Sequence, residues 1–358
     1  MTTADVEYAT RQAHANELYN NLALDEAAAE YRSILAADPR DYAAQLGLAR
    51  TLSRQRDHEQ ARLAIERCIE IDPNRPEAYV ALGVLEFLLD HSAEARSALE
   101  KALSLSPNDP EALLTLAQVA ADEGNREAAD ANMAAARAVI EAMPEGGDRS
   151  ALDALAWHSQ TYVLLTFGEG AAAREAAQQV IALQAANPYA ASLAYSNLGI
   201  LDAQEKHYDQ AIDYLERAYS MNPRFYRAAS ALGRILTLRR QYSRAAEVLA
   251  TVVEHPFSDQ AMDRYVYGMA LAKSGQREAA LGQYRLALRH GLKGIFRLQA
   301  WWQTIWLSQW GRMAVIGAAV ALVLIYVVVG KPQGSTLSLL VVAGVVLFMQ
   351  YVLGRAKR

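Results

Sequence analysis

Two apolar stretches joined by a short polar turn recur along the chain from about residue 8 to residue 291. Within each stretch the apolar side chains return at the spacing of one helical face, and the turns include RQRDH, LDHSA, QEKHY and KSGQR. Pro39, Pro73 and Pro107 follow successive units at intervals of 34 residues. Proline ends a helix because it lacks an N–H and disfavours a helical residue before it. The pattern predicts a series of helix–turn–helix units and an all-α chain.

Small residues hold fixed places within these units. The spacing of 12, 7 and 5 residues recurs in Gly83, Ala95, Ala102 and Pro107, in Gly199, Ala211, Ala218 and Pro223, and in Ala49, Ala61, Cys68 and Pro73. Small side chains are needed where two helices cross closely, because the side chains at the crossing set the distance between the axes. One helix pair cannot bury its own apolar face, so stacked pairs are predicted to form a superhelical solenoid.

The period and the openings Tyr79-x2-Leu82-Gly83 and Tyr195-x2-Leu198-Gly199 resemble the tetratricopeptide repeat family. Eight such units are predicted, with repeats 1–4 over residues 1–143 and repeats 5–8 over residues 157–291. An irregular insertion, marked by Pro144, Gly146 and Gly147, is predicted over residues 144–156. The resemblance implies a concave groove, lined by the first helix of each unit, that binds a helix or peptide of another protein.

The groove face, mapped onto this sequence, is mixed and partly apolar, which suits an amphipathic helix or an extended segment. Asn16 and Arg50 also lie on it, but Val80 follows where the family's carboxylate clamp would need a basic or polar residue, so no clamp is predicted. The alternative is that the apolar residues pack between units and that the two arginines are solvated. The candidate groove residues are Val80, Val84, Phe87, Leu114, Gln118, Leu193, Ile200, Arg227, Arg234, Met262, Tyr265 and Met269.

No catalytic or cofactor motif is recognisable in the sequence. GxxxxGK[ST], HExxH and GxSxG are absent, and none of the seven histidines pairs with another at the spacing of metal ligands. The single cysteine, Cys68, occupies a small-residue position, which favours packing over reactivity. The sequence therefore predicts a protein that is not an enzyme and that holds no cofactor or metal.

The C-terminal part differs in composition from the rest. The whole chain carries −5, but residues 279–358 contain nine basic residues and no acidic one, which leaves −14 for residues 1–278. Residues 313–330 and 337–354 are each free of charge and each about 27 Å long as a helix, close to a bilayer's apolar core of about 30 Å. They predict a transmembrane hairpin over 312–354, followed by a basic tail over 355–358. The alternative is a pair of buried core helices.

Small residues within the two charge-free stretches would allow close helix packing in the membrane: Gly317, Ala321, Ala343 and Gly344. The flanking basic residues predict that both ends of the hairpin face the cytoplasm. Because the N-terminus has no basic start before an apolar run, no secretory signal peptide is predicted, which agrees with a cytoplasmic solenoid.

Residues 292–311 predict an amphipathic helix at the membrane interface, where tryptophan prefers to lie and where arginine meets anionic lipid. The alternative is a helix that caps the last repeat. The interface residues are Trp301, Trp302, Trp306, Trp310, Arg297 and Arg312.

These features together predict a membrane-anchored scaffold that binds protein partners at the cytoplasmic face, in the assembly or organisation of a membrane complex. A bacterial inner membrane is the expected location. The alternative function is an integral structural or accessory subunit of an oligomeric membrane complex, through the hairpin. Nucleic acid is not an expected partner, because the basic residues flank the predicted spans rather than forming a groove.

Overall fold

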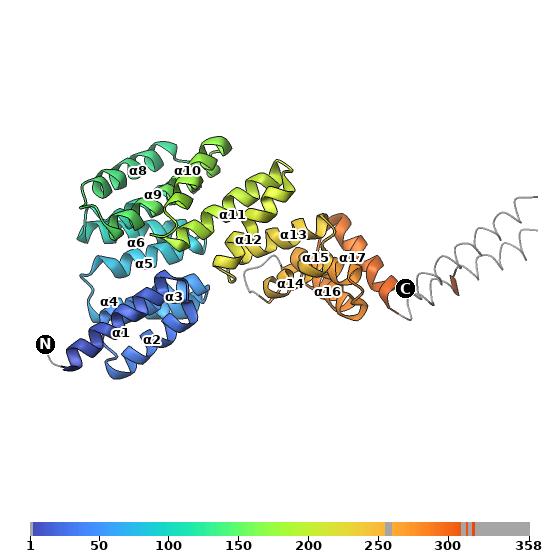
Figure 1. The fold of residues 1–358 in the computed structure, drawn as a ribbon, viewed down its shortest axis with the longest axis horizontal. Coiled ribbons are helices and arrows are strands. Elements are labelled where there is room, and N and C mark those ends of the chain that lie inside the picture. Colours follow the sequence, from blue (N-terminus) through green and yellow to red (C-terminus); the bar gives the residue numbers. More distant parts are fainter. Residues whose placement is uncertain (1–2, 255–259, 309–312, 314–316, 319–358) are drawn as a thin grey trace, which may run out of the picture. The chain divides into compact units, whose positions relative to one another are not determined.

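The computed structural model describes residues 3–254, 260–308, 313, 317 and 318 (Figure 1). Within these residues every regular element is an α-helix, which confirms the predicted all-α repeat fold. The helices are α1 (Thr3–Asn20), α2 (Leu24–Ala37), α3 (Tyr42–Gln55), α4 (His58–Ile71), α5 (Pro76–Leu88), α6 (Ser92–Leu105), α7 (Pro110–Asp122), α8 (Arg126–Glu141), α9 (Gly147–Thr166), α10 (Gly170–Ala182), α11 (Pro188–Gln204), α12 (Tyr208–Met221), α13 (Tyr226–Leu238), α14 (Tyr242–Val252), α15 (Gln260–Lys273), α16 (Arg277–Arg289) and α17 (Gly294–Leu307).

The first helix of each pair begins where the sequence supplies a cap. The side chains of Asp41, Asp109 and Asn187 accept hydrogen bonds from backbone N–H groups in the first turns of α3, α7 and α11. Proline at the start of α5, α7 and α11 costs nothing there, since the first N–H groups of a helix have no partner within it.

The turn inside each pair also repeats. One residue between the two helices adopts a left-handed conformation, and in the first four units these residues lie 34 apart, at Leu22, Arg56, Asp90 and Gly124. Later units use Gly168, Lys206, Arg240 and Gly275. Half of these positions hold a residue with a Cβ, for which this conformation is strained.

The small residues do what their spacing predicts. A Cβ added to Gly83 would lie 2.4 Å from Cγ of Leu99, and one added to Gly199 would lie 2.5 Å from Cγ of Leu215. Each glycine therefore lets α5 approach α6, or α11 approach α12, and each leucine fills the space that the glycine leaves. Cys68 is fully buried in the equivalent small position of α4.

The chain divides into two compact units, which we call unit 1 (Met1–Leu232) and unit 2 (Gly233–Arg358). In unit 1, one apolar cluster joins α1 to α5, and others join α5 to α7, α7 to α9, and α9 to α11. The core is therefore a row of neighbouring clusters, as expected of stacked repeats.

The prediction of an irregular insertion over residues 144–156 is wrong for most of its length. Helix α9 begins at Gly147, directly after Gly146, and continues without a break to Thr166. Leu152 and Leu155 on this extension pack against the core between α7 and α9, so burial of apolar area favours the longer helix.

The predicted transmembrane hairpin lies almost wholly outside the described residues. Among the helices that the structure describes, none has both the length and the apolar character needed to cross a bilayer. Of the four residues predicted to pack inside the membrane, Ala321, Ala343 and Gly344 are outside the described part. Gly317 is exposed, with open space around it.

Candidate functional site

The inner face of unit 1 is formed by the first helices of the pairs, which contact one another in order from α1 through α3, α5, α7 and α9 to α11. Side chains on this face reach past their neighbours to more distant repeats. Phe87 of α5 meets Tyr162 of α9 edge to face, with 5.5 Å between the ring centroids. The hydroxyl of Tyr162 in turn donates to Asp122 of α7 at 2.8 Å. The face is thus a continuous surface rather than a row of separate helices.

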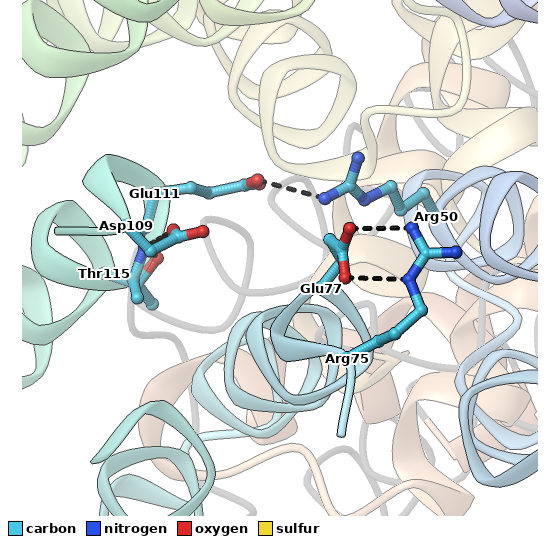
Figure 2. A network of polar contacts seen from close by, with 7 residues as sticks. Arg50, Arg75, Glu77, Asp109, Glu111 and Thr115 are labelled. Carbon is cyan, nitrogen blue, oxygen red and sulfur yellow. Dashed lines mark hydrogen bonds and ion pairs between the residues drawn. The ribbon is translucent and has the colours of Figure 1, made fainter. Parts of the chain in front are cut away.

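Charged groups from three repeats form a network on this surface (Figure 2). The guanidinium of Arg50 on α3 lies 3.2 Å from a carboxylate oxygen of Glu111 on α7, across α5. On the near end of α5, Arg75 makes two hydrogen bonds to Glu77, and its guanidinium stacks 3.9 Å from the ring centre of Tyr42. The network gives the inner face alternating positive and negative positions.

The ionisation of these groups follows their surroundings. The Glu111 carboxylate raises the pKa of Arg50, and the hydrogen bonds from Arg75 lower the pKa of Glu77. Burial raises the pKa of Asp109, the capping residue of α7, although the backbone N–H of Ala112 opposes this. The pairs Arg50–Glu111 and Arg75–Glu77 therefore stay charged near neutral pH.

A second set of contacts joins the first two repeats to the sixth and seventh. The guanidinium of Arg54, near the end of α3, lies between two aromatic rings, 3.8 Å from the centre of Tyr19 and 4.3 Å from that of Tyr189. Arg224, just before α13, donates to both carboxylate oxygens of Asp25 on α2, at 2.8 and 2.7 Å. Residues 199 apart in sequence are therefore brought together within unit 1.

The candidate groove residues of unit 1 fall into two groups. Val80 and Leu114 are each only 1% exposed and belong to the core between repeats, which agrees with the packing alternative. Gln118 is buried as well and donates to the hydroxyl of Ser159 at 2.7 Å. The residues that retain exposed surface on the inner face are Val84, Phe87, Leu193, Ile200 and Arg227.

In unit 2 the candidate residues serve contacts within the unit. Arg234 pairs with the buried carboxylate of Asp263 at 2.7 Å, and the hydroxyl of Tyr265 donates to Gln299 at 2.6 Å. Met262 and Met269 are half-buried on α15. The Arg234 pair explains why this arginine faces α15 rather than only solvent.

One cluster has the residue types of a metal site. Ligand atoms of Asp202, Glu205 and His207 lie within 4.8 Å of one another. The guanidinium of Arg174 on α10, however, lies 2.8 Å from Asp202 and 3.0 Å from Glu205 and supplies the positive charge that these carboxylates need. The arrangement has a counterpart at Glu86, which pairs with Arg62 of the preceding repeat and with His91. It fits an ion pair that joins neighbouring repeats.

Helix α17 carries most of the predicted interface residues. One face packs on the rest of unit 2, with Ala300 fully buried and the Phe296 ring 5.4 Å from that of Tyr265. Trp301 and Trp302 are 55% and 46% exposed on another face, and Trp306 is half-buried and stacks on Trp302. Arg297 is exposed, whereas Trp310 and Arg312 lie outside the described residues.

The sequence analysis missed the residues that close the inner face. Arg54 lies four residues after Arg50, which is the spacing of one helical face, and this was the available signal. No sequence spacing identifies the partners Tyr189 and Arg224, because they come from other repeats.

Two family models described as tetratricopeptide repeat match this chain, one at residues 23–84 and 202–264 and the other at residues 76–119. No curated protein matches it.

Three solved structures resemble the chain at low sequence identity. A chain of the APC/C hetero-tetramer Cut9–Hcn1 is 16% identical with a TM-score of 0.57, and the match covers 83% of this chain and 55% of that one. This chain therefore spans about half the length of that relative. PilF of Pseudomonas aeruginosa is 19% identical with a TM-score of 0.50, covering 63% and 95%. Human IFIT1 is 16% identical with a TM-score of 0.53, covering 86% and 72%.

At these identities the solved structures show the fold alone, and that fold agrees with the geometry described above. Repeats of this kind generally serve as protein-interaction scaffolds. The chain therefore contains tetratricopeptide repeats, over residues 23–119 and 202–264, within a helical-repeat solenoid.

Proposed function

We propose that this chain is a membrane-tethered scaffold that holds a protein partner on its repeats at the cytoplasmic face of a bacterial inner membrane. The partner belongs to a membrane complex that the scaffold assembles or organises. Tethering raises the effective concentration of the repeats for partners already at the membrane. In this proposal the chain has no enzymatic activity of its own.

The observation that carries the membrane part of the proposal is the double role of α17. Residues of α17 lie 34 positions after those of α15, so that Gln299 and Trp302 correspond to Tyr265 and Gly268. The bond between Tyr265 and Gln299 shows that α17 stacks on α15 as the first helix of a ninth repeat would. It therefore caps the array with one face.

The opposite face of α17 corresponds to the face that α15 turns toward its own second helix, α16. In α15, Arg264 donates to Gln283 of α16 at 3.0 Å, and a Cβ on Gly268 would lie 3.1 Å from the Tyr284 ring. In α17 the equivalent residues are Leu298 and Trp302, which are 63% and 46% exposed. Trp302 stands where a small residue is needed for close helix packing, so this face suits a deformable lipid interface better than a second helix.

The position of α17 in the chain also supports this proposal. Only five residues separate Leu307 from Met313, the first residue of the 18-residue stretch without charge. Indole rings prefer the headgroup level, where the apolar ring and the N–H are both satisfied. An interfacial helix directly before an apolar stretch is what a tether requires.

Tryptophan fluorescence tests the membrane assignment with an internal control. In one full-length variant Trp302 is the only tryptophan kept, and in the other it is Trp157, which lies under Arg137 in unit 1. With the protein in vesicles, brominated lipid should quench Trp302 and leave Trp157 unaffected. Equal quenching of the two, or none at Trp302, would remove the interfacial assignment.

Cross-linking in native membranes tests the scaffold itself. A photoreactive residue at Ile200 on the inner face should capture a defined protein, whereas one at Leu63, exposed on the outer helix α4, should not. Native mass analysis after mild extraction then separates a scaffold with a substoichiometric client from a fixed subunit of an oligomer. A stoichiometric ring would favour the structural-subunit alternative.

A further inference from the structure

The ends of unit 1 are held together by side chains alone. We name as the latch the residues that join repeats 1 and 2 to repeats 6 and 7, which are Asp25, Arg54, Arg56, Tyr189, Arg224 and Tyr226. Three contacts make it up: Arg224 with Asp25, Arg54 with Tyr189, and Arg56 over the ring of Tyr226 at 5.7 Å. Each contact joins a cationic guanidinium to a carboxylate or an aromatic face.

The first half of the latch is positioned by its own repeats. Nη1 of Arg54 donates to the backbone carbonyl of Tyr19 at 3.2 Å, which fixes the guanidinium over the Tyr19 ring. Nε2 of Gln55 donates to Asp25 at 2.7 Å, which ties the start of α2 to the end of α3. Repeats 1 and 2 thus present one preformed surface to Tyr189, Arg224 and Tyr226.

The apolar cores on the two sides of the latch are separate. One cluster belongs to helices α1 to α5, and the cluster that includes Ala194 and Leu198 belongs to α9 to α12. Within the described residues, no apolar cluster and no extensive helix–helix contact spans from α1–α4 to α11–α13. Opening the latch therefore breaks only polar and aromatic side-chain contacts and exposes no core.

The latch contacts are individually weak because they are open to water. The side chains of Asp25 and Arg224 are 64% and 49% exposed. An exposed ion pair shifts an equilibrium by about fivefold at most, and salt screens it. An exposed cation–π contact contributes a similar factor, about two- to fivefold. Three such contacts make a closure that a modest competing interaction can reverse.

The latch closes the inner face that carries the candidate groove. Beneath it lie the Arg50–Glu111 pair and the half-buried side chains of Val84, Leu193 and Ile200. We infer that unit 1 is an autoinhibited groove, closed by the latch between repeats 1–2 and 6–7, and that a partner gains the inner face only when the latch opens. Affinity for a partner then falls in proportion to the fraction of molecules that are open. This inference rests on the proposed function, because the inner face is taken as the partner site.

Distances between spin labels test the opening directly and need no partner. Labels are placed on cysteines at Ala36 and Ser220, both exposed and outside the latch, in the full chain carrying Cys68→Ala. Alanine suits position 68, since Ala102 and Ala218 hold the same place in other repeats. A control pair at Ala36 and Leu63 lies entirely within repeats 1 and 2.

The closed latch predicts one short distance between Ala36 and Ser220 at about 0.01 M salt and a growing long-distance population at about 1 M, where the Debye length falls from about 30 to about 3 Å. Arg224→Asp should enlarge the long population at low salt, and Asp25→Arg with Arg224→Asp should reduce it again. The control pair should not change. If Arg224→Asp leaves the distances unchanged, or the charge swap fails to restore them, the latch is not the closure.

A size-selective label tests whether closure blocks the groove. Val84→Cys, on the inner face, should react with N-ethylmaleimide in the closed chain but react slowly with a polyethylene-glycol maleimide, and Arg224→Asp should accelerate only the larger reagent severalfold. Leu63→Cys on the outer face should react with both at rates that the latch does not alter. If Val84→Cys reacts equally with both reagents before the latch is broken, the inference is overturned. A latch that opens as described, together with no cross-linked partner at Ile200, would count against the proposed function alone.

Discussion

Gly83 offers the sharpest test of how the repeats are built. A Cβ at this position would lie 2.4 Å from Cγ and 2.6 Å from Cδ2 of Leu99, and 3.3 Å from the backbone oxygen of Ala95. Leu99 is fully buried and its Cγ is not a flexible end, so α5 and α6 must move apart. Overpacking of this kind costs about 1–3 kcal/mol, whereas alanine gains about 1 kcal/mol over glycine as a helix former. We expect Gly83→Ala to destabilise this pair by about 1 kcal/mol net.

The clash can be separated from helix propensity by a double-mutant cycle with Leu99→Ala. That change alone should cost about 2–5 kcal/mol, but in its background Gly83→Ala has no clash and should stabilise by about 1 kcal/mol. The coupling is then about 2 kcal/mol, or about thirtyfold in the protection of α5 and α6 amides against hydrogen exchange.

Gly282 is the matched control for this cycle. It lies inside α16 with nothing within 4 Å of an added Cβ. Gly282→Ala should therefore increase protection by about 1 kcal/mol, the propensity difference alone. Equal effects of the Gly83 and Gly282 substitutions, or a coupling near zero between Gly83 and Leu99, would refute the close-approach explanation.

Three further outcomes are expected from the buried polar groups and the turns. Burial would raise the pKa of Glu86, but the hydrogen bonds from Arg62 and His91 outweigh it and lower that pKa, so its contribution is complete above the ordinary glutamate pKa and is lost on acidification. Glu86→Gln should weaken this pH dependence in acid unfolding. Burial lowers the pKa of His158 to about 4, so stability should fall between pH 6.5 and 4 as the unfolded state takes up the proton. Its ring should titrate near pH 4 by NMR, and His158→Gln should remove that fall. Gly124→Ala should destabilise by about 1 kcal/mol in urea unfolding, because φ is +73° and no neighbour interferes.

The repeat period and the small residues were predictable from sequence because each helix pair meets the same packing problem. The position that holds Gly83 must admit Leu99, and the same requirement returns 34 residues later or earlier in the chain. A constraint that repeats leaves a periodic signal. Helix α9 was misjudged because Pro144, Gly146 and Gly147 indicate a loop locally, whereas Leu152 and Leu155 decide for a helix through packing on another repeat.

The closure of unit 1 was not predictable because it depends on accumulated geometry. Whether Arg224 reaches Asp25 is set by the small rotation between each pair of neighbouring repeats, summed over six of them. Likewise, Val84 and Val80 both map to the groove in sequence, but Val80 is buried between repeats while Val84 keeps exposed surface. Period alone gives the face on which a residue lies, and its burial depends on how tightly the superhelix is wound.

The rule that explains Gly83 also explains where the array stops. The first helix of a repeat accepts a second helix when the residue at the crossing is small, as at Gly199 against Leu215 and Gly268 against Tyr284. At the ninth such position the chain places Trp302, which is exposed on the face that a second helix would otherwise cover. The packed face of α17, with Ala300 fully buried, still completes the core of the last pair. A single change of residue size at one repeating position can thus end a solenoid and leave an aromatic surface at its end, and the interface proposed for α17 follows from the same packing rule as the repeats.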